Sequence, residues 1–208
     1  QQDSKGSAMN TTLPIIEKLI TRSRSIPELR SVFQLFLFNS APAESSNGHL
    51  LKTDDGNIQA QGMDMAVVHS EGEDNGHYEL REASALIPSH KVTASFQKDE
   101  RYPEGVQERP YHSDSGEQEK VRRNALRLDP RFLITDNPDA VNGPPIVTRK
   151  GVVLGGNSRT MSILHAYAER PDSAERYVSA LKEKAHVFGL SQEDIEAFTD
   201  PVLVRVVD

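Results

Sequence analysis

The amino-acid sequence predicts an α/β (α+β) domain that follows an N-terminal helical extension. Two strand-like stretches flank an Asp-Asn-Gly turn at residues 74–76, which is a strong hairpin signal. A glycine pair at residues 155–156 separates an apolar, strand-like run from a helical pattern. The β-branched run PVLVRVV at residues 201–207 predicts a further strand. Helical patterns lie between these strands, and this mixture favours a sheet covered by helices.

The composition and charge of the chain restrict its function classes. Its 208 residues suit one domain with extensions, and a hydrophobic content of 36% indicates a core confined to part of the chain. The net charge of −7 argues against a basic footprint for nonspecific nucleic-acid binding over the whole chain. Because cysteine is absent, disulfides and thiolate zinc sites are excluded. No apolar run approaches the roughly 18 residues that span a membrane, so we expect a cytoplasmic protein.

The chain is expected to divide into four parts. Residues 1–11 read as a disordered segment or a tag remnant, and residues 12–40 predict two amphipathic helices. Those helices would pack on a core or a partner, and through them the protein would form a homo-oligomer or join a larger parent protein. Residues 41–62 are rich in Ser, Asn, Gly and Asp and read as a linker, and residues 63–208 form the folded domain. The abrupt apolar end suggests a fragment of a longer protein.

A hairpin and a long polar stretch open the predicted domain. Residues 63–70 and 78–86 are its first two strands. Residues 91–114 are polar throughout, and long ordered loops of this kind are often functional. The helix that follows has Ser115 as its N-cap candidate and acidic residues in its first turn.

The second half of the predicted domain alternates strands with helices. Two strands over residues 144–156, with a turn at 149–151, lead to a helix over 158–170. The next helix is expected to begin at Asp172 or Ser173 and to end near Gly189. A short helix with a Ser191–Asp194 capping box and a strand over 201–207 follow.

The sequence GGNSRT, between a predicted strand and a predicted helix, has the chemistry of an anion site. Helix N-termini carry unpaired N–H groups and a partial positive charge, and Gly155 and Gly156 let backbone approach a ligand closely. Ser158 and Thr160 would add hydroxyl donors, and Arg159 would bind phosphate with its fork of donors. The sequence is neither a Walker A motif nor G-x-G-x-x-G. From the residues alone, a phosphate cradle and a plain tight turn both remain open.

Two further stretches carry candidate chemistry. Ser89 and His90 end a strand-like run, where the histidine would be an acid/base group, a phosphate contact or an ordinary loop residue. The stretch GVQERPYH supplies Gln107, Glu108, Arg109 and His112, and Gln with Arg suits recognition of a phosphate or a base edge. Neither a G-x-S-x-G elbow nor H-E-x-x-H occurs, so spacing nominates no catalytic triad and no metal ligands.

Taken in order, these segments resemble a known family. ASALIPSH, YPEGVQERPY, LDPRFL and DAVNGPPIVTRKGVVLGGNSRTMSILHAY are similar to the ParB/sulfiredoxin superfamily, and most similar to its DdrB-like ParB domain from phage and mobile-element proteins. The resemblance covers about residues 78–170, and PVLVRVV fits a further strand of that group. It implies a small mixed-sheet, sulfiredoxin-like domain that binds a nucleoside triphosphate.

The resemblance also implies site residues. The turn that holds the triphosphate of CTP in ParB proteins, and of ATP in sulfiredoxin, matches Gly155, Gly156, Asn157, Ser158 and Arg159, with Thr160 after it. Gln107 and Arg109 match a Gln-x-Arg beside the nucleotide, and Ser89-His90 match the Ser-His pair. The chain departs from sulfiredoxin because it lacks the reactive cysteine, and from ParB because Asn157 and Thr160 replace a glutamate and an arginine.

The leading hypothesis is a domain that binds ATP or CTP with Mg²⁺ and acts on or near DNA in a phage or mobile-element protein. Hydrolysis, if it occurs, would use His90 or Glu108 as the acid/base group. One alternative is a metal-dependent nuclease with Glu104, Glu108 or Asp114 on the metal. Another is a non-catalytic interaction module in which the glycine turn is only architecture.

Overall fold

The structure is a computed structural model, and it describes residues 49–52, 56–91, 95–106 and 109–207. The expected terminal segment at 1–11 and the expected helices at 12–40 lie outside the described residues. The chain divides into two units after residue 45, which lies within the segment expected to be a linker, residues 41–62.

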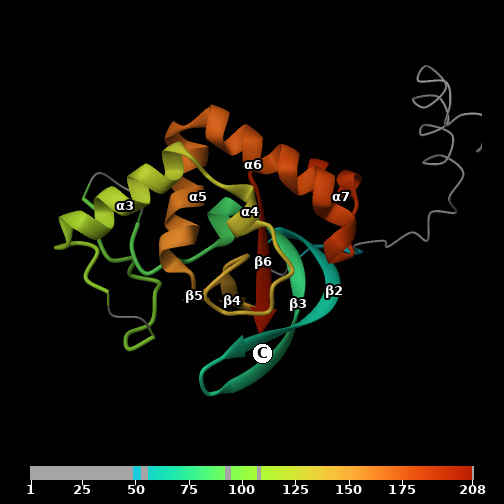
Figure 1. The fold of residues 1–208 in the computed structure, drawn as a ribbon, viewed down its shortest axis with the longest axis horizontal. Helices are drawn as coiled ribbons and strands as arrows, with labels where there is room; N and C mark the ends of the chain where they lie inside the picture. The colour runs from blue at the N-terminus through green and yellow to red at the C-terminus, as the bar shows by residue number, and fades with distance from the viewer. Residues whose placement is uncertain (1–48, 53–55, 92–94, 107–108, 208) are drawn as a thin grey trace, which may run out of the picture. The chain divides into compact units, whose positions relative to one another are not determined.

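Within the described residues, six strands form one sheet in the order β1-β2-β3-β6-β4-β5. β6 pairs antiparallel with β3 and parallel with β4, so the sheet is mixed, as predicted. Figure 1 shows β6 in its middle, with the long β2–β3 hairpin curving away from the helices. The strands are β1 (His49–Lys52), β2 (Ile58–His69), β3 (Gly72–Glu82), β4 (Ile146–Thr148), β5 (Val153–Gly155) and β6 (Pro201–Val207).

The predicted linker at residues 41–62 is wrong for β1 and for the first part of β2. Its Ser, Asn and Gly content suggested a loop, but pairing with β3 places Ala60 opposite Leu80 in the core. Only one residue in two needs to be apolar when a strand has one buried face, so composition concealed the strand. At Gly62 a side chain would collide with the Phe188 carbonyl, which explains a glycine within this strand.

Helices pack on the sheet and on one another. α3 packs on α5, and α5 packs on α6, whose Tyr177 hydroxyl accepts a hydrogen bond from Leu203 N of β6 at 3.1 Å. The core lies between them, with Leu80, Ile163 and Leu203 completely buried. The helical elements are η1 (Ala83–Ala85), α3 (Ser115–Leu126), α4 (Pro130–Leu133), α5 (Asn157–Glu169), α6 (Pro171–Lys184), η2 (Ala185–Phe188) and α7 (Gln192–Glu196).

Helix ends differ from the predictions by one or two residues. Asp114, not Ser115, caps α3, because its carboxylate accepts from Gly116 N and Glu117 N at 2.9 and 3.1 Å. α6 begins at Pro171 rather than at Asp172 or Ser173, because proline at the first helical position lacks only an N–H that has no helical partner. The capping box at the start of α7 is confirmed. No helix in the described part of the chain is long and apolar enough to span a membrane.

Candidate functional site

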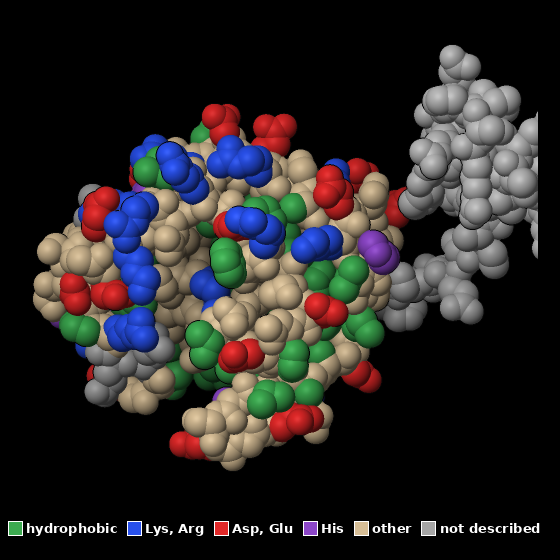
Figure 2. Space-filling model, viewed as in Figure 1, with side chains coloured by type: hydrophobic (Ala, Val, Ile, Leu, Met, Phe, Trp, Pro, Cys, Tyr) green, Lys and Arg blue, Asp and Glu red, His purple; other side chains and the backbone are tan. Residues whose placement is uncertain are grey.

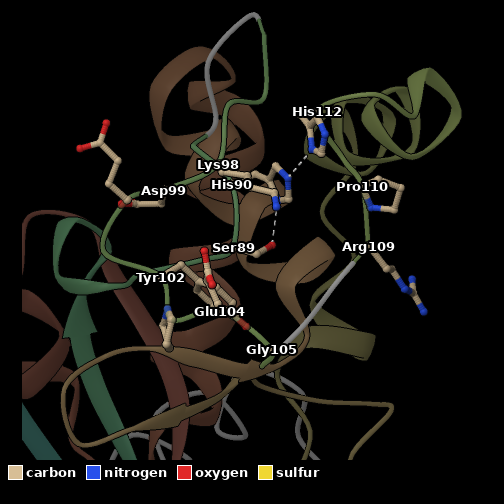
Figure 3. A pocket seen from close by; sticks show the side chains of 12 residues that line it. Ser89, His90, Lys98, Asp99, Tyr102, Glu104, Gly105, Arg109, Pro110 and His112 are labelled. Carbon is tan, nitrogen blue, oxygen red and sulfur yellow. Dashed lines mark hydrogen bonds between the residues drawn. The ribbon is translucent and has the colours of Figure 1, made fainter.

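A cavity of about 550 Å³ lies beside the end of the sheet where the Ser-His pair emerges (Figure 3). Its lining is drawn from Ser89–His90, from the loop 98–105 and from the segment 109–112. This volume is within the range of small-molecule sites. The polar stretch that the sequence marked as a long functional loop therefore supplies most of the wall.

Backbone pairing fixes where the Ser-His pair lies. Ile87 forms a parallel bridge with Val152, so the chain passes the start of β5 just before it reaches the cavity. Ser89 N then donates to the Asn157 side-chain oxygen at 2.7 Å, and Ser89 O accepts from Asp99 N at 3.1 Å. Held on both sides, Ser89 presents its hydroxyl at a fixed place.

His90 lies in a chain of hydrogen-bonded side chains. Its Nδ1 is 3.0 Å from Ser89 Oγ, and its Nε2 is 3.2 Å from His112 Nδ1 (dashed lines in Figure 3). The two imidazoles are stacked at 11°, and the buried Tyr111 packs edge-on against His90. Burial, followed by the nearby His112 and Lys98, lowers the pKa of His90. The His90 ring is therefore neutral at pH 7 and can accept a proton.

Charges around the cavity are mixed. Lys98 and Arg109 contribute cations, and Glu100 and Glu104 contribute carboxylates. A hydrogen bond from Arg101 holds the pKa of Asp99 below its usual value, which keeps this carboxylate ionised and paired. The Arg109 side chain is 59% exposed and points away from His90, toward a loose 3.9 Å pair with Glu117.

The glycine turn forms the N-terminus of α5, as predicted. Gly156 is the N-cap in the left-handed region at φ 85°, a conformation that favours glycine, and no side chain caps the helix. Beyond its bond to Ser89, the Asn157 amide nitrogen lies 3.3 Å from Tyr102 Oη and from Val153 O. The Thr160 hydroxyl donates to Gly156 O at 3.1 Å. These two side chains hold the turn together, and none of Gly155–Thr160 is among the described residues that line the cavity.

Arg159 is directed to a different part of the molecule from the cavity. Its guanidinium donates to the carbonyls of Val141 and Ala140 and covers Gly156, where a Cβ would lie 2.7 Å from Arg159 Nη2. Arg205 donates to three more carbonyls of the same loop, those of Asp139, Asn142 and Pro144. In this arrangement both arginines order the 139–144 loop.

A comparison with protein families matches residues 70–208 to the ddrB-like ParB superfamily domain. The chain belongs to this family. The match includes the Ser-His pair, the cavity loops, the glycine turn and the last strand of this ParB-like domain. No curated protein and no solved structure gives a significant match to the chain.

The ParB-like domain brings some predicted site residues together and separates others. Ser89, His90 and Arg109 share the cavity, whereas Gln107 and Glu108 lie outside the described residues. Ser158 does not line the cavity, and its buried hydroxyl has no hydrogen-bond partner among the described residues. Lys98 was not predicted, because a lysine in a polar loop has no local signal; His112 was noticed only as part of a motif. No group of three metal-ligating side chains occurs within the described residues.

Proposed function

We propose that this ParB-like domain binds a nucleoside triphosphate, ATP or CTP, in the cavity beside Ser89 and His90. The observation that carries the proposal is the hydrogen bond from Ser89 N to Asn157 Oδ1. This bond joins the Ser-His pair, which lines the cavity, to the first residue of α5, so the N-terminus of that helix lies one residue behind the cavity lining. A helix N-terminus favours anions because its N–H groups and dipole present partial positive charge.

The side chains of the cavity suit a phosphate chain. Lys98 supplies a point charge, and Arg109 would supply a guanidinium fork after a rotation of its exposed side chain. His90 and Ser89 offer hydrogen-bonding groups at the floor. Burial is the largest cause of the lowered pKa of His90, and Lys98, a smaller cause, is a cation that a phosphate would neutralise.

Mg²⁺ would accompany the triphosphate and neutralise part of its charge. Mg²⁺ in nucleotide sites is held by one or two carboxylates together with phosphate oxygens. Glu100 and Glu104 lie in the cavity wall, and their carboxylates would bind the Mg²⁺ ion. The nuclease alternative loses one of its expected ligands, because the Asp114 carboxylate accepts two backbone N–H bonds as the cap of α3.

The nucleotide proposal is tested by thermal shift with ATP, CTP, GTP, UTP and inorganic triphosphate, each with Mg²⁺. We expect stabilisation by at least one nucleotide, and about tenfold weaker binding in Lys98→Gln, which loses one direct charge contact. Lys150→Gln is the matched control, since Lys150 is exposed on the β4–β5 turn and does not line the cavity. Absence of stabilisation by every nucleotide would refute the proposal.

The surface of α3 supports action near DNA as a second part of the proposal. Lys120 and Arg123 are exposed on α3 and spaced i, i+3, which places them on one side of the helix, and the exposed Arg127 follows directly as its C-cap. Figure 2 shows Lys and Arg side chains gathered over the α3 region of an otherwise mixed surface. An Arg-rich stripe suits phosphate backbones.

The DNA proposal is tested by the salt dependence of binding to a fluorescent single-stranded oligonucleotide. An Arg123→Gln/Arg127→Gln variant should bind more weakly and reduce the slope of log K against log salt by about 1.4, at about 0.7 for each lost phosphate contact. An unchanged slope would place any DNA contact elsewhere. The proposed origin in a phage or mobile element rests on the family resemblance. Hydrolysis of the nucleotide rests on it too.

A further inference from the structure

We infer that Ser89 is a nucleophile that accepts the terminal phosphoryl group of a nucleoside triphosphate in the cavity, with His90 as its base and His112 as the positioning partner of that base. This inference rests on the proposed nucleotide site and adds a chemical step to it. It makes Ser89 a modification site of the protein.

The first support is the geometry of the side chains. Activated nucleophiles lie within about 2.6–3.2 Å of their base, and the base is in turn oriented by a third group. Ser89 Oγ, His90 Nδ1, His90 Nε2 and His112 Nδ1 form such a series, with separations of 3.0 and 3.2 Å. Figure 3 shows the three side chains in sequence along one wall of the cavity.

The second support is the arrangement of protons that this series requires. His90 accepts the Ser89 proton at Nδ1 only if its own proton is on Nε2. That proton then needs an acceptor, and His112 Nδ1 provides one when His112 carries its proton on Nε2. His112 is exposed, so its Nε2–H can donate to water. His112 therefore selects the tautomer in which His90 is a base toward Ser89.

The third support is the rigidity and protection of the pair. The Ser89 backbone is hydrogen-bonded on both sides, through Asn157 and Asp99, and the residue is only 3% exposed. Tyr111 covers one side of the His90 ring. A purely structural Ser–His bond would be equally stable facing the core, but here both residues line the cavity.

Ligand charge would strengthen the base. Burial lowers the pKa of His90, and the nearby charge of Lys98 lowers it further. A bound polyphosphate would neutralise Lys98 and make the imidazolium more favourable. His90 thus becomes a better proton acceptor when the phosphoryl donor is present.

The step balances as a single displacement. A bond forms between Ser89 Oγ and the γ-phosphorus, and the bond from that phosphorus to the β,γ-bridging oxygen breaks. The nucleoside diphosphate leaves with the electron pair, and the Ser89 proton moves to His90 Nδ1. Lys98 and Arg109 stabilise the charge on the phosphate oxygens. The products are phosphoserine at position 89 and a nucleoside diphosphate.

The test is peptide mass spectrometry of the full chain after incubation with whichever of ATP, CTP, GTP and UTP stabilises it, with Mg²⁺. We expect a phosphoryl adduct on Ser89 or, if water removes it quickly, nucleotide hydrolysis that Ser89→Ala abolishes. His90→Gln should slow the step at least 100-fold, and His112→Asn about tenfold, while the nucleotide still stabilises each variant. Ser113→Ala, an exposed serine on the same segment, and His69→Gln on the distant hairpin are the controls.

The outcomes separate the inference from the nucleotide proposal. Nucleotide binding with an unmodified Ser89 and no hydrolysis overturns the inference and leaves the proposed function intact. Hydrolysis that continues at the parent rate in Ser89→Ala, or a phosphoryl group on His90, also overturns it. Failure to bind any nucleotide overturns both. A melting temperature measured for each variant identifies losses that come from unfolding, and Ser89→Cys, which keeps a nucleophile of similar size, should retain partial transfer.

Discussion

The Ser89–His90 cavity and the glycine turn at Gly155–Thr160 were both predicted to contact phosphate, and the structure uses their polar groups differently. In the cavity, Ser89, His90 and Lys98 form part of the lining. In the turn, the side chains of Asn157 and Thr160 are buried and bonded within the protein. The comparison indicates that the cavity side chains would meet the ligand and that the turn would position them.

Asn157 is the residue that connects the two regions. Its amide group binds Ser89 on one side and lies within 3.3 Å of Tyr102 and Val153 on the other. Asparagine can donate and accept at once, which a glutamate at this position could not do when ionised. The departure from the ParB pattern at this residue therefore has a structural reason in this chain.

The largest expected effect is from Asn157→Ala. Removing the amide leaves Ser89 N buried without its acceptor and frees the end of the turn, which should lower the free energy of unfolding by about 2–4 kcal/mol. Urea denaturation measures this. Asn124→Ala on the exposed side of α3 should change stability by less than about 0.5 kcal/mol. A loss below about 1 kcal/mol for Asn157→Ala would show that the two regions are not coupled through this residue.

Arg159→Ala should have the next largest effect, and on stability rather than on nucleotide binding. The variant loses the donors to Val141 O and Ala140 O and loosens the 139–144 loop, a change of about 1–3 kcal/mol in unfolding free energy. Nucleotide affinity should fall less than threefold, in contrast to the tenfold loss expected for Lys98→Gln. If instead Arg159→Ala weakened binding tenfold or more at unchanged stability, the guanidinium would be a phosphate ligand and the cavity would extend to the turn.

A smaller effect is expected from Gly156→Ala. Alanine at φ 85° is strained, and its Cβ would press on the Arg159 guanidinium, so about 1–2 kcal/mol of stability should be lost. Double-mutant analysis with Arg159→Ala should recover part of that loss, because the guanidinium is then absent. Purely additive effects would show that the cost comes from the backbone conformation alone. Gly105→Ala, also at positive φ but with open space around it, is the control for backbone strain.

Much of the fold could be predicted from local patterns. The strand–turn–strand before α5, the capping box of α7 and the final strand each have a signal within a few residues. The hairpin itself was predicted, but its turn was placed wrongly: the turn lies at Ser70–Glu71, and residues 74–76 pair with β2 inside β3. β1 and the start of β2 could not be predicted from local patterns, because their sequence is polar and they are ordered by strand pairing within the sheet. The predicted N-cap of α3, Ser115, was one residue away from the observed cap, Asp114, because both residue types are good N-caps.

The candidate site was predicted less completely than the fold. Motif order identified Ser89, His90 and Arg109, which do share a cavity. The direction of a side chain is set by tertiary contacts, so the sequence could not show that Arg159 extends to the 139–144 loop. The pairing of His90 with His112, 22 residues later, likewise depends on how the polar loop folds back.

The smallest expected effect is the pH dependence of His90, which should move stability and binding in opposite directions. Because the folded protein holds the His90 pKa below its ordinary value of 6.5, the unfolded chain takes up the proton first as the pH falls. His90 thus contributes stability that is present above pH 6.5 and lost as the pH falls through the folded pKa. A bound polyphosphate would raise the His90 pKa, so binding should take up protons and tighten over the same window. Calorimetry in buffers of different ionisation enthalpy measures that proton uptake. The uptake should vanish in His90→Gln and persist in the control His69→Gln. Proton uptake that survives in His90→Gln would come from another group in the cavity.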